Sequence, residues 1–165
     1  MSLNAEYDEL IKLAATKYLP AYDWRLFKAQ IFEESKMNPY AVSHAGAKGI
    51  AQFMPKTWIE WRIKSGYPTH DETHPEAAIF TGACYMAHLI GQWKSPRPLI
   101  DRYLLAAASY NSGLGDILKA QKAAGMANGY SQIMAKLPDV EPQHSTETIN
   151  YGKRILKWWA QEITG

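Results

Sequence analysis

Apolar residues recur at helical spacing along almost the whole chain. Side chains three and four positions apart share one face of an α-helix, so this pattern predicts amphipathic helices that each bury one face. Runs of alternating apolar and polar residues, which are typical of strands, do not occur in the sequence. The expected fold is therefore all-α, with helices at about 3–18, 22–36, 55–65, 98–110, 113–125 and 145–163 and a central helix from residue 75.

The central helix is the clearest of these elements. It begins near Pro75, a residue favoured in the first helical turn, and Gly82 and Ala83 within its apolar stripe would let another helix approach closely. The stripe is expected to face the core and consists of Ile79, Gly82, Ala83, Met86, Leu89, Ile90 and Trp93. The polar stretch at 138–145, which contains two prolines, is expected to be a loop.

The helix expected at 22–36 carries two neighbouring glutamates. Trp24, Phe27 and Ile31 fall on one side of this helix and should face the core. On the same helical wheel Glu34 lies roughly 50° from the centre of that side, whereas Glu33 lies roughly 150° away. Glu34 is therefore expected to point inward and Glu33 outward.

The end of this helix is a useful place for a carboxyl group. Pro39 disfavours helical geometry at Asn38, so the helix should stop just after Glu34. A carboxyl partly desolvated by Phe27 and Ile31 would have a raised pKa and could serve as a general acid for glycoside cleavage. The other interpretation is a boundary glutamate that caps a neighbouring backbone, and the helical pattern alone favours that interpretation.

A loop with glycines at 46 and 49 follows, and Ser43 to Pro55 reads S-H-A-G-A-K-G-I-A-Q-F-M-P. Together with Glu34-Ser35 it resembles the soluble lytic transglycosylase (SLT) domain of glycoside hydrolase family 23, whose signature is E-S followed by S-x-x-G-A-x-G-x-x-Q-x-M-P. The resemblance continues at 75–83, 106–113 and 147–151 and covers about residues 20–160. It implies a lysozyme-like helical domain that cleaves peptidoglycan.

The family pattern, carried over residue by residue, makes Glu34 the sole catalytic carboxylate. It gives Ser43 the role of a hydrogen-bonding partner that orients Glu34. Without the motif, the better interpretation of Ser43 is a loop serine that closes a local turn. The pattern departs from the family at Lys36-Met37 and at Ser109, and neither departure touches the implied chemistry.

The resemblance also implies a set of substrate-binding residues. Gln52, Tyr110 and Asn111 would hold the acetamido and hydroxyl groups of the sugar, because amide and phenol side chains both donate and accept hydrogen bonds. Met54 would line the same groove. The stretch at 110–113 also reads as a helix C-terminus, and both interpretations can hold together.

Glu147 and Tyr151 are four residues apart and should share one helical face. They resemble the E-T-x-x-Y pair that lies beside the catalytic glutamate in the family. The other interpretation of Glu147 is an acidic residue favoured in a first helical turn.

The implied reaction is the lytic one, in which a single carboxylate acts as acid and then as base and leaves a 1,6-anhydro-muramyl end. Two alternatives stay open. A lysozyme-type muramidase would need a water held by a second acid such as Asp71, Asp101 or Glu147. A non-catalytic peptidoglycan-binding or virion structural module would keep the groove without a competent Glu34.

Size and charge narrow the class of protein. The chain has 165 residues, 47% of them hydrophobic, which suits a single catalytic domain over 1–165. No hydrophobic run is long enough for a membrane span. The formal net charge of +2 comes from scattered Lys and Arg residues, so nucleic acid is not expected as a partner. We expect a monomer that acts on peptidoglycan glycan strands.

No cofactor and no metal are expected. The stretch His70-Asp71-Glu72-Thr73-His74 lacks the H-E-x-x-H order, and Pro75 indicates that it precedes a helix. The single cysteine, Cys84, excludes an intramolecular disulfide.

The first residues are acidic at Glu6, Asp8 and Glu9, where a secretory signal would have basic residues and then an apolar stretch. An enzyme without such a signal fits a phage endolysin, a virion enzyme or a domain excised from a larger secreted protein, and we favour the endolysin. It would stay in the host cytoplasm until another protein opens the membrane to the cell wall or periplasm.

Overall fold

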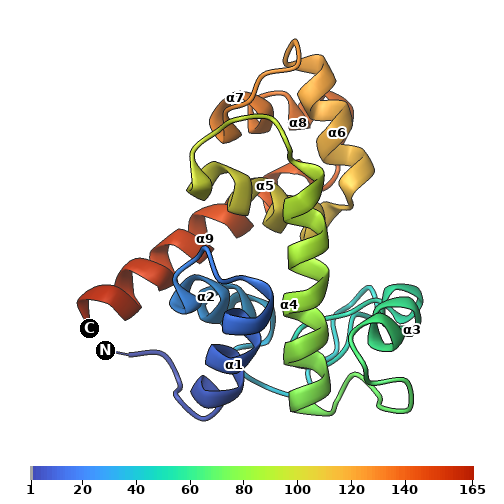
Figure 1. The fold of residues 1–165 in the computed structure, drawn as a ribbon. Coiled ribbons are helices and arrows are strands. Elements are labelled where there is room, and N and C mark those ends of the chain that lie inside the picture. The colour runs from blue at the N-terminus through green and yellow to red at the C-terminus, as the bar shows by residue number, and fades with distance from the viewer. Residues whose placement is uncertain (1) are drawn as a thin grey trace. The chain divides into compact units, whose positions relative to one another are not determined.

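The computed structural model describes residues 2–165, and the elements that it contains are helices (Figure 1). The all-α prediction is confirmed, and the only other regular pairing in that part of the chain is at two isolated β-bridges, Val42 with Lys48 and Lys48 with Phe53. The helices are α1 (Asp8–Tyr18), α2 (Trp24–Ser35), α3 (Pro55–Lys64), α4 (Pro75–Gln92), α5 (Leu99–Ser112), α6 (Leu114–Ala123), α7 (Tyr130–Met134), α8 (Leu137–Val140) and α9 (Ser145–Thr164).

Three helix assignments differ from the sequence prediction. Helix α1 begins at Asp8 because Asn4 accepts a hydrogen bond from the backbone N–H of Glu6 at 2.9 Å, which favours a local turn in place of a helix. Helices α7 and α8 were not predicted, because five and four residues are too few to show a helical period. Helix α8 also corrects the expected loop at 138–145, since Pro138 fits a first helical turn.

The chain forms two compact units. Unit 1 contains the residues up to Tyr85 together with Ile155–Gly165, and unit 2 contains Met86–Arg154. The expectation of one domain stays a prediction. The core of unit 1 includes Ile11, Leu26, Phe27, Ile31, Ile50, Phe53, Trp58 and Ile79, and that of unit 2 includes Met86, Leu89, Trp93, Tyr103, Leu105, Ile117, Ile133 and Leu137.

The predicted core stripe of α4 is largely confirmed. Ile79, Ala83 and Met86 are fully buried, and Trp93, one residue beyond the helix, is buried as well. Ile90 differs, because it is only half-buried. Buried side chains as large as those of Ile79 and Met86 each stabilise the fold by about 1.5–3 kcal/mol relative to exposure.

An ion cluster inside unit 1 joins segments that are distant in the sequence. The ammonium group of Lys28 is fully buried and lies 2.9 Å from carboxylate oxygens of both Asp8 and Glu162. Glu162 also accepts hydrogen bonds from the hydroxyl of Ser2 and the backbone N–H of Leu3. The cluster therefore ties the first residues and the end of α9 to α2.

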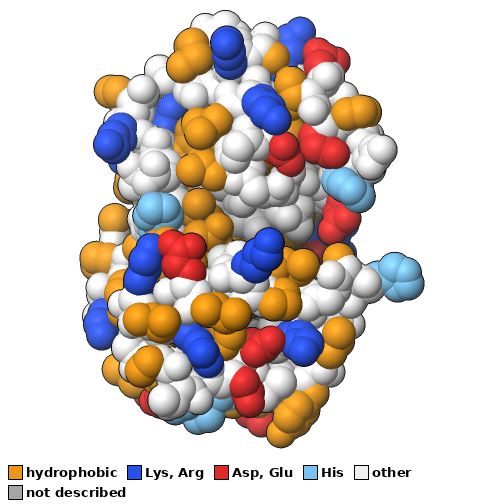
Figure 2. Space-filling view, turned by 90° about the vertical axis from the view of Figure 1, so that its right-hand side faces the viewer, with side chains coloured by type: hydrophobic (Ala, Val, Ile, Leu, Met, Phe, Trp, Pro, Cys, Tyr) orange, Lys and Arg blue, Asp and Glu red, His pale blue; other side chains and the backbone are white. Residues whose placement is uncertain are grey.

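The surface carries charges of both signs. On the face in Figure 2, Lys and Arg side chains are interspersed with Asp and Glu side chains. Among the described residues, no helix combines the length and the hydropathy needed to cross a bilayer.

Candidate active site

Helix α2 places Glu34 in its last turn. The carboxylate of Asp23 caps the start of the helix by accepting a hydrogen bond from the backbone N–H of Arg25 at 3.0 Å. The helix ends after Ser35, where Lys36 and Met37 both take left-handed backbone conformations, with φ of 53° and 66°. Such conformations are unusual for residues other than glycine, and they turn the chain sharply away just after Glu34.

The side chain of Met37 is 3% exposed, so burial holds this strained turn in place. The predicted helix end is confirmed, although the helix is ended by the left-handed residues Lys36 and Met37, which come before Pro39. Glu34 itself is half-buried, between the fully buried Phe27 side of the helix and solvent.

Ser35 connects this helix end to the glycine loop. Its hydroxyl donates to the carbonyl oxygen of Ile50 at 2.7 Å and lies 3.3 Å from the carbonyl oxygen of Ile31. Ile50 is fully buried. This link could not be predicted from residue type alone, although the fixed place of Ser35 beside Glu34 in the motif was a signal of a role.

The glycine loop has a defined fold of its own. The backbones of Lys48 and Phe53 exchange two hydrogen bonds of 3.0 and 3.1 Å, and the N–H of Gly49 donates to the carbonyl oxygen of Ala41 at 2.9 Å. A Cβ atom at Gly49 would lie 1.8 Å from the backbone oxygen of Glu72, so only glycine permits this approach. Gly46 has φ of 95° but open space around it.

Ser43 closes a turn within this loop. Its backbone N–H donates to the carbonyl oxygen of Ala47, and its hydroxyl oxygen accepts from the N–H of Ala47, both at 2.9 Å. The turn-closing interpretation of Ser43 is therefore confirmed. A hydroxyl that accepts here still carries its own proton for donation, and its role toward Glu34 stays a prediction.

Gln52 is committed more deeply to the loop than expected. It has a left-handed backbone with φ of 51°, and its amide nitrogen donates to the carbonyl oxygens of Ala41 at 3.0 Å and Gly49 at 2.8 Å. Both N–H groups of the amide thus hold the loop together. We expected Gln52 both to donate hydrogen bonds to a sugar and to accept them. Because its amide nitrogen already donates within the loop, its Oε1 atom is the group left to accept a hydrogen bond from a sugar.

Met54 lies just before α3 and is 44% exposed. An exposed apolar side chain beside the loop suits the lining of a groove. That role stays a prediction.

Glu33 corrects the helical-wheel prediction. Its side chain is only 8% exposed, because the indole N–H of Trp158 on α9 donates to its Oε2 atom at 2.7 Å. The ammonium group of Lys36 lies 3.2 Å from the same oxygen. The wheel assumed one buried face, whereas α2 is covered by α9 on this second face as well.

In unit 2 the predicted residues lie at the end of α5 and the start of α9. Tyr110 and Asn111 occupy the last turn of α5, which ends at Ser112 and is capped by Gly113 with φ of 98°, so the helix C-terminus is confirmed. The Oδ1 atom of Asn111 accepts a hydrogen bond from the hydroxyl of Thr148 at 2.8 Å. This bond joins the end of α5 to the start of α9. Because it fixes the Oδ1 atom of Asn111, it also sets the orientation of the side-chain amide.

Glu147 and Tyr151 have different environments although both belong to α9. Tyr151 is 3% exposed, whereas Glu147 projects from the first turn into solvent. The first-turn interpretation of Glu147 is confirmed. Their place beside Glu34 stays a prediction, as do the sugar contacts of Tyr110 and Asn111.

Two of the three acids considered for a water-activating role have other partners. The carboxylate of Asp71 accepts from the hydroxyl and the N–H of Thr73, and these hydrogen bonds lower the pKa of Asp71. Asp101 accepts a hydrogen bond of 3.1 Å from the backbone N–H of Tyr130, the first residue of α7. These hydrogen bonds fit a structural role for Asp71 and for Asp101.

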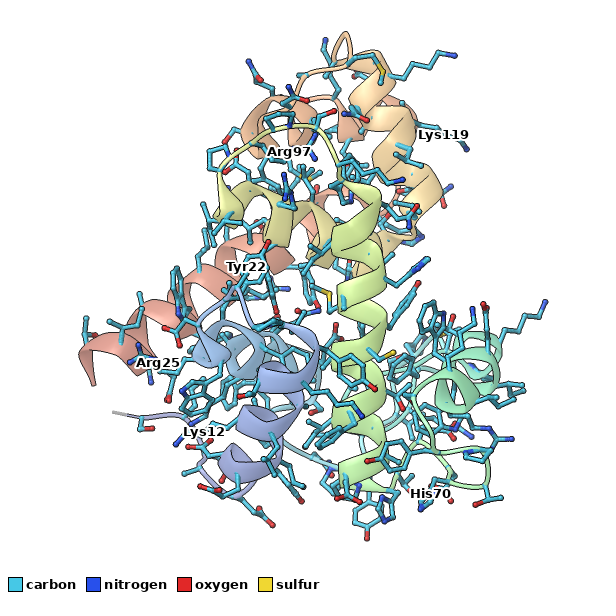
Figure 3. The ribbon with its side chains drawn as sticks, in the orientation of Figure 1. Lys12, Tyr22, Arg25, His70, Arg97 and Lys119 are labelled. Atoms are coloured by element: carbon cyan, nitrogen blue, oxygen red, sulfur yellow. The ribbon has the colours of Figure 1, made fainter. Side chains whose placement is uncertain are left out.

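The residues of the histidine stretch before α4 make contacts that stabilise the local fold. The carbonyl oxygen of His70 accepts from the indole of Trp58 and from Arg62, and Figure 3 places His70 near the start of α4. The Nδ1 atom of His74 accepts from the N–H of Ala77 at 3.2 Å, which confirms that the stretch precedes a helix. Within residues 2–165 no three His, Cys, Asp or Glu side chains are grouped as metal ligands would be.

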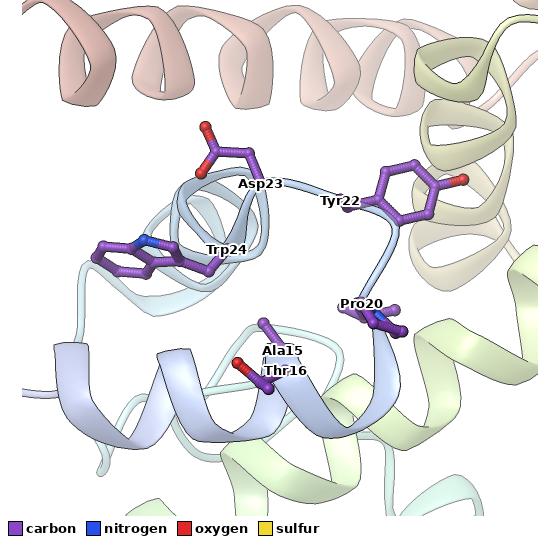
Figure 4. Close-up of a pocket in the computed structure, with 7 residues that line it drawn as sticks. Ala15, Thr16, Pro20, Tyr22, Asp23 and Trp24 are labelled. Atoms are coloured by element: carbon purple, nitrogen blue, oxygen red, sulfur yellow. The ribbon is translucent and has the colours of Figure 1, made fainter.

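A pocket of about 240 Å³ lies at the opposite end of α2 from Glu34 (Figure 4). Burial alone would raise the pKa of Asp23 there, but hydrogen bonds from Arg25 and Trp159 outweigh burial and lower that pKa. Asp23 is therefore ionised and unsuited to protonate a leaving group. The pocket is lined by Ala15, Thr16, Leu19, Pro20, Tyr22, Asp23 and Trp24.

Comparison with known families decides the assignment. The sequence model described as "Transglycosylase SLT domain" matches residues 9–133, which include Glu34, Ser35 and the whole glycine loop. The chain belongs to this family. The match confirms the resemblance seen in the motifs, although the stretch at 147–151 lies beyond the matched residues.

Curated relatives of this SLT domain carry consistent names. The membrane-bound lytic murein transglycosylases F of Alteromonas mediterranea and Haemophilus influenzae are 29% and 30% identical to it over 140 residues, or 82% of the chain. Those residues cover 29% and 28% of the relatives, so the chain spans less than a third of their length.

Solved structures share the fold. An inactive mutant of the lytic transglycosylase Slt from Pseudomonas aeruginosa superposes with a TM-score of 0.76 at 22% identity, covering 98% of this chain and 25% of that one. The 70 kDa soluble lytic transglycosylase of Escherichia coli gives 0.73 at 22% identity, covering 96% and 24%. The all-helical fold of the SLT type is thereby confirmed.

Proposed function

We propose that this SLT domain cleaves the glycan strands of bacterial peptidoglycan as a lytic transglycosylase, at the β-1,4 bond between N-acetylmuramic acid and N-acetylglucosamine. The observation that carries the proposal is the place of Glu34, half-buried in the last turn of α2 and joined through Ser35 to the glycine loop, within the residues that match the family. The names of the curated relatives support the same reaction.

Glu34 acts first as an acid. Its protonated carboxyl gives its proton to the glycosidic oxygen as the bond from that oxygen to the anomeric carbon of N-acetylmuramic acid breaks. The acetamido group of the same sugar stabilises the positive charge that develops at the anomeric carbon.

Glu34 then acts as a base. Its carboxylate removes the proton from the 6-hydroxyl of the muramic acid residue, and the 6-oxygen bonds to the anomeric carbon. The proton lost in the first step is restored, no water is consumed, and the products are a 1,6-anhydro-muramyl end and a free 4-hydroxyl on N-acetylglucosamine. One carboxyl group suffices for this route, and no cofactor takes part.

The other predicted residues take supporting roles in this proposal. Ser43 donates its hydroxyl proton toward the Glu34 carboxylate, and the Oε1 atom of Gln52 accepts from the sugar. Met54 lines the groove. In unit 2, Tyr110, Asn111, Glu147 and Tyr151 are proposed to bind the glycan strand.

Product analysis tests the proposal. Mass spectrometry of muropeptides released from purified peptidoglycan should detect anhydro-muramyl ends, which are lighter by one water than reducing ends. Reducing ends alone would mean a lysozyme-type hydrolysis and would direct attention to Glu147. An absence of released muropeptides would favour a binding module without catalysis.

The biological setting is a separate part of the proposal. A phage endolysin that waits in the host cytoplasm would lyse cells only after their membranes are opened. The relatives named above are bacterial membrane-bound enzymes, so a lysis assay is needed. Lysis of permeabilised cells with intact cells spared supports the endolysin role, and failure on both contradicts it.

A further inference from the structure

The two residues next to Glu34 in the sequence, Glu33 and Ser35, both bind other segments and so anchor the helical turn that carries Glu34. Ser35 binds the carbonyl oxygen of Ile50 in the glycine loop, and Glu33 binds the indole of Trp158 on α9. Residues two apart on a helix point about 200° apart around its axis, so the two anchors hold nearly opposite sides of one turn. Together the two anchors therefore resist rotation of this turn about the helix axis.

The Glu33 anchor is well built. The indole N–H of Trp158 donates to a carboxylate that is 8% exposed, at 2.7 Å, which is the short distance expected of a charge-assisted bond. The indole ring also meets the ring of Phe32 edge-on, with centroids 5.1 Å apart. Figure 1 shows α9 running beside α2 at this point.

Lys36 completes the cluster from the left-handed residue that ends α2. Its ammonium group lies 3.2 Å from the Glu33 carboxylate, 4.7 Å from the centre of the Phe32 ring and 4.9 Å from that of Trp158. The charge of Glu33 is thus compensated within the cluster. Four side chains therefore pack around the backbone that orients Glu34.

We propose that Glu33 and Trp158 are positioning residues for Glu34, holding its carboxyl at the angle that the proton transfers require. The inference rests on the proposed function of Glu34 as acid and base. A displacement of about 1 Å in a reacting group can lower a rate by about a hundredfold, so an anchor one residue away has a measurable effect on turnover.

Four variants test the pair in the full chain. Trp158→Phe removes the indole N–H and keeps an aromatic ring, Glu33→Leu removes the acceptor, and Glu33→Gln keeps an acceptor oxygen. The matched control is Lys157→Gln, which removes a cation lying 4.7 Å from the centre of the same indole ring without touching Glu33. Rates of muropeptide release are measured against peptidoglycan concentration.

Trp158→Phe and Glu33→Leu are expected to lower kcat about tenfold with KM changed by less than about twofold. Glu33→Gln should rescue most of the loss seen in Glu33→Leu, and Lys157→Gln should match the wild type. A wild-type kcat in Trp158→Phe, or equal losses in the two Glu33 variants, would overturn the positioning role. If Glu33→Leu fails to fold, Trp158→Phe decides the matter.

Hydrogen exchange separates this proposal from the proposed function. The N–H of Lys36, bonded to the carbonyl oxygen of Phe32 at 2.8 Å, reports the order of the last turn. It should exchange faster in Trp158→Phe than in Lys157→Gln even if the wild type released no muropeptides. Equal exchange in the two variants would contradict the anchor whether or not the chain is an enzyme.

Discussion

The hydroxyl of Ser35 donates a hydrogen bond of 2.7 Å to the carbonyl oxygen of Ile50. Both groups are buried, so the bond joins the end of α2 to the glycine loop without competition from water. The donor, Ser35, is the residue that follows Glu34 in the sequence. The geometry of the loop and the direction of the Glu34 carboxyl are therefore set together.

Replacing Ser35 with alanine should weaken both stability and activity. The change leaves the Ile50 carbonyl unsatisfied, which costs about 1–3 kcal/mol of unfolding free energy, and it should slow muropeptide release about tenfold through misplacement of Glu34. Urea denaturation and initial rates measure the two effects.

Ser65→Ala is the matched control for this experiment. Ser65 is a buried serine whose hydroxyl lies 2.6 Å from that of Thr81 and donates to the carbonyl oxygen of Trp61. Its loss should cost stability of similar size and leave the rate per folded molecule unchanged. Equal rates for the two variants would show that the Ser35 bond has no part in positioning Glu34.

The two loop glycines should respond differently to alanine. Gly46→Ala introduces only the backbone strain of a positive φ in open space, about 1–2 kcal/mol. Gly49→Ala adds a clash with the backbone oxygen of Glu72, so about 1–3 kcal/mol more should be lost as the loop shifts. Unfolding free energies in urea compare them, and equal losses would mean that the loop does not approach Glu72 so closely.

The ion cluster around Lys28 predicts a pH dependence of stability. Burial alone would raise the pKa of Glu162, but hydrogen bonds from Lys28, Leu3 and Ser2 outweigh it and lower that pKa. A carboxyl whose pKa is lowered by folding stabilises the protein above its unfolded pKa of about 4.3, and this stability is lost as the pH falls through the lower folded value.

Glu162→Gln should therefore flatten the acid limb of the stability curve. Its unfolding free energy should fall less than that of the wild type below about pH 4.3, where the wild type must protonate Glu162. Asp8 faces the same ammonium group and remains in both proteins. Parallel curves for the two proteins would contradict a role for Glu162 in the acid transition.

Much of the fold follows from the spacing of apolar residues. That spacing places both ends of α2 and α9 and the start of α4 within a few residues of their observed positions, because each helix buries a continuous stripe. It misses α7 and α8, which are too short to show a period. The burial of Glu33 was also missed, because a helical wheel does not report that Trp158, far along the chain, covers a second face of α2.

The residues of the candidate site could be predicted from the sequence, but their hydrogen-bond partners could not. The motif identifies Glu34, Ser43 and Gln52, because their residue types and spacing are unusual together. It does not reveal that Gln52 spends both amide N–H groups on Ala41 and Gly49, since that depends on the left-handed backbone at Gln52 and the path of the loop. Hydrogen-bond partners of this kind come from tertiary structure.

The role of Glu34 is tested most directly by comparing Glu34→Gln with Glu60→Gln on purified peptidoglycan. Glu60 is an exposed glutamate on α3, paired with Lys64, and serves as the control. Mass spectrometry should show anhydro-muramyl products from the wild type and from Glu60→Gln, and a loss of at least about a hundredfold in Glu34→Gln with the fold intact. Anhydro-muramyl products at the wild-type rate from Glu34→Gln would contradict the central role of Glu34.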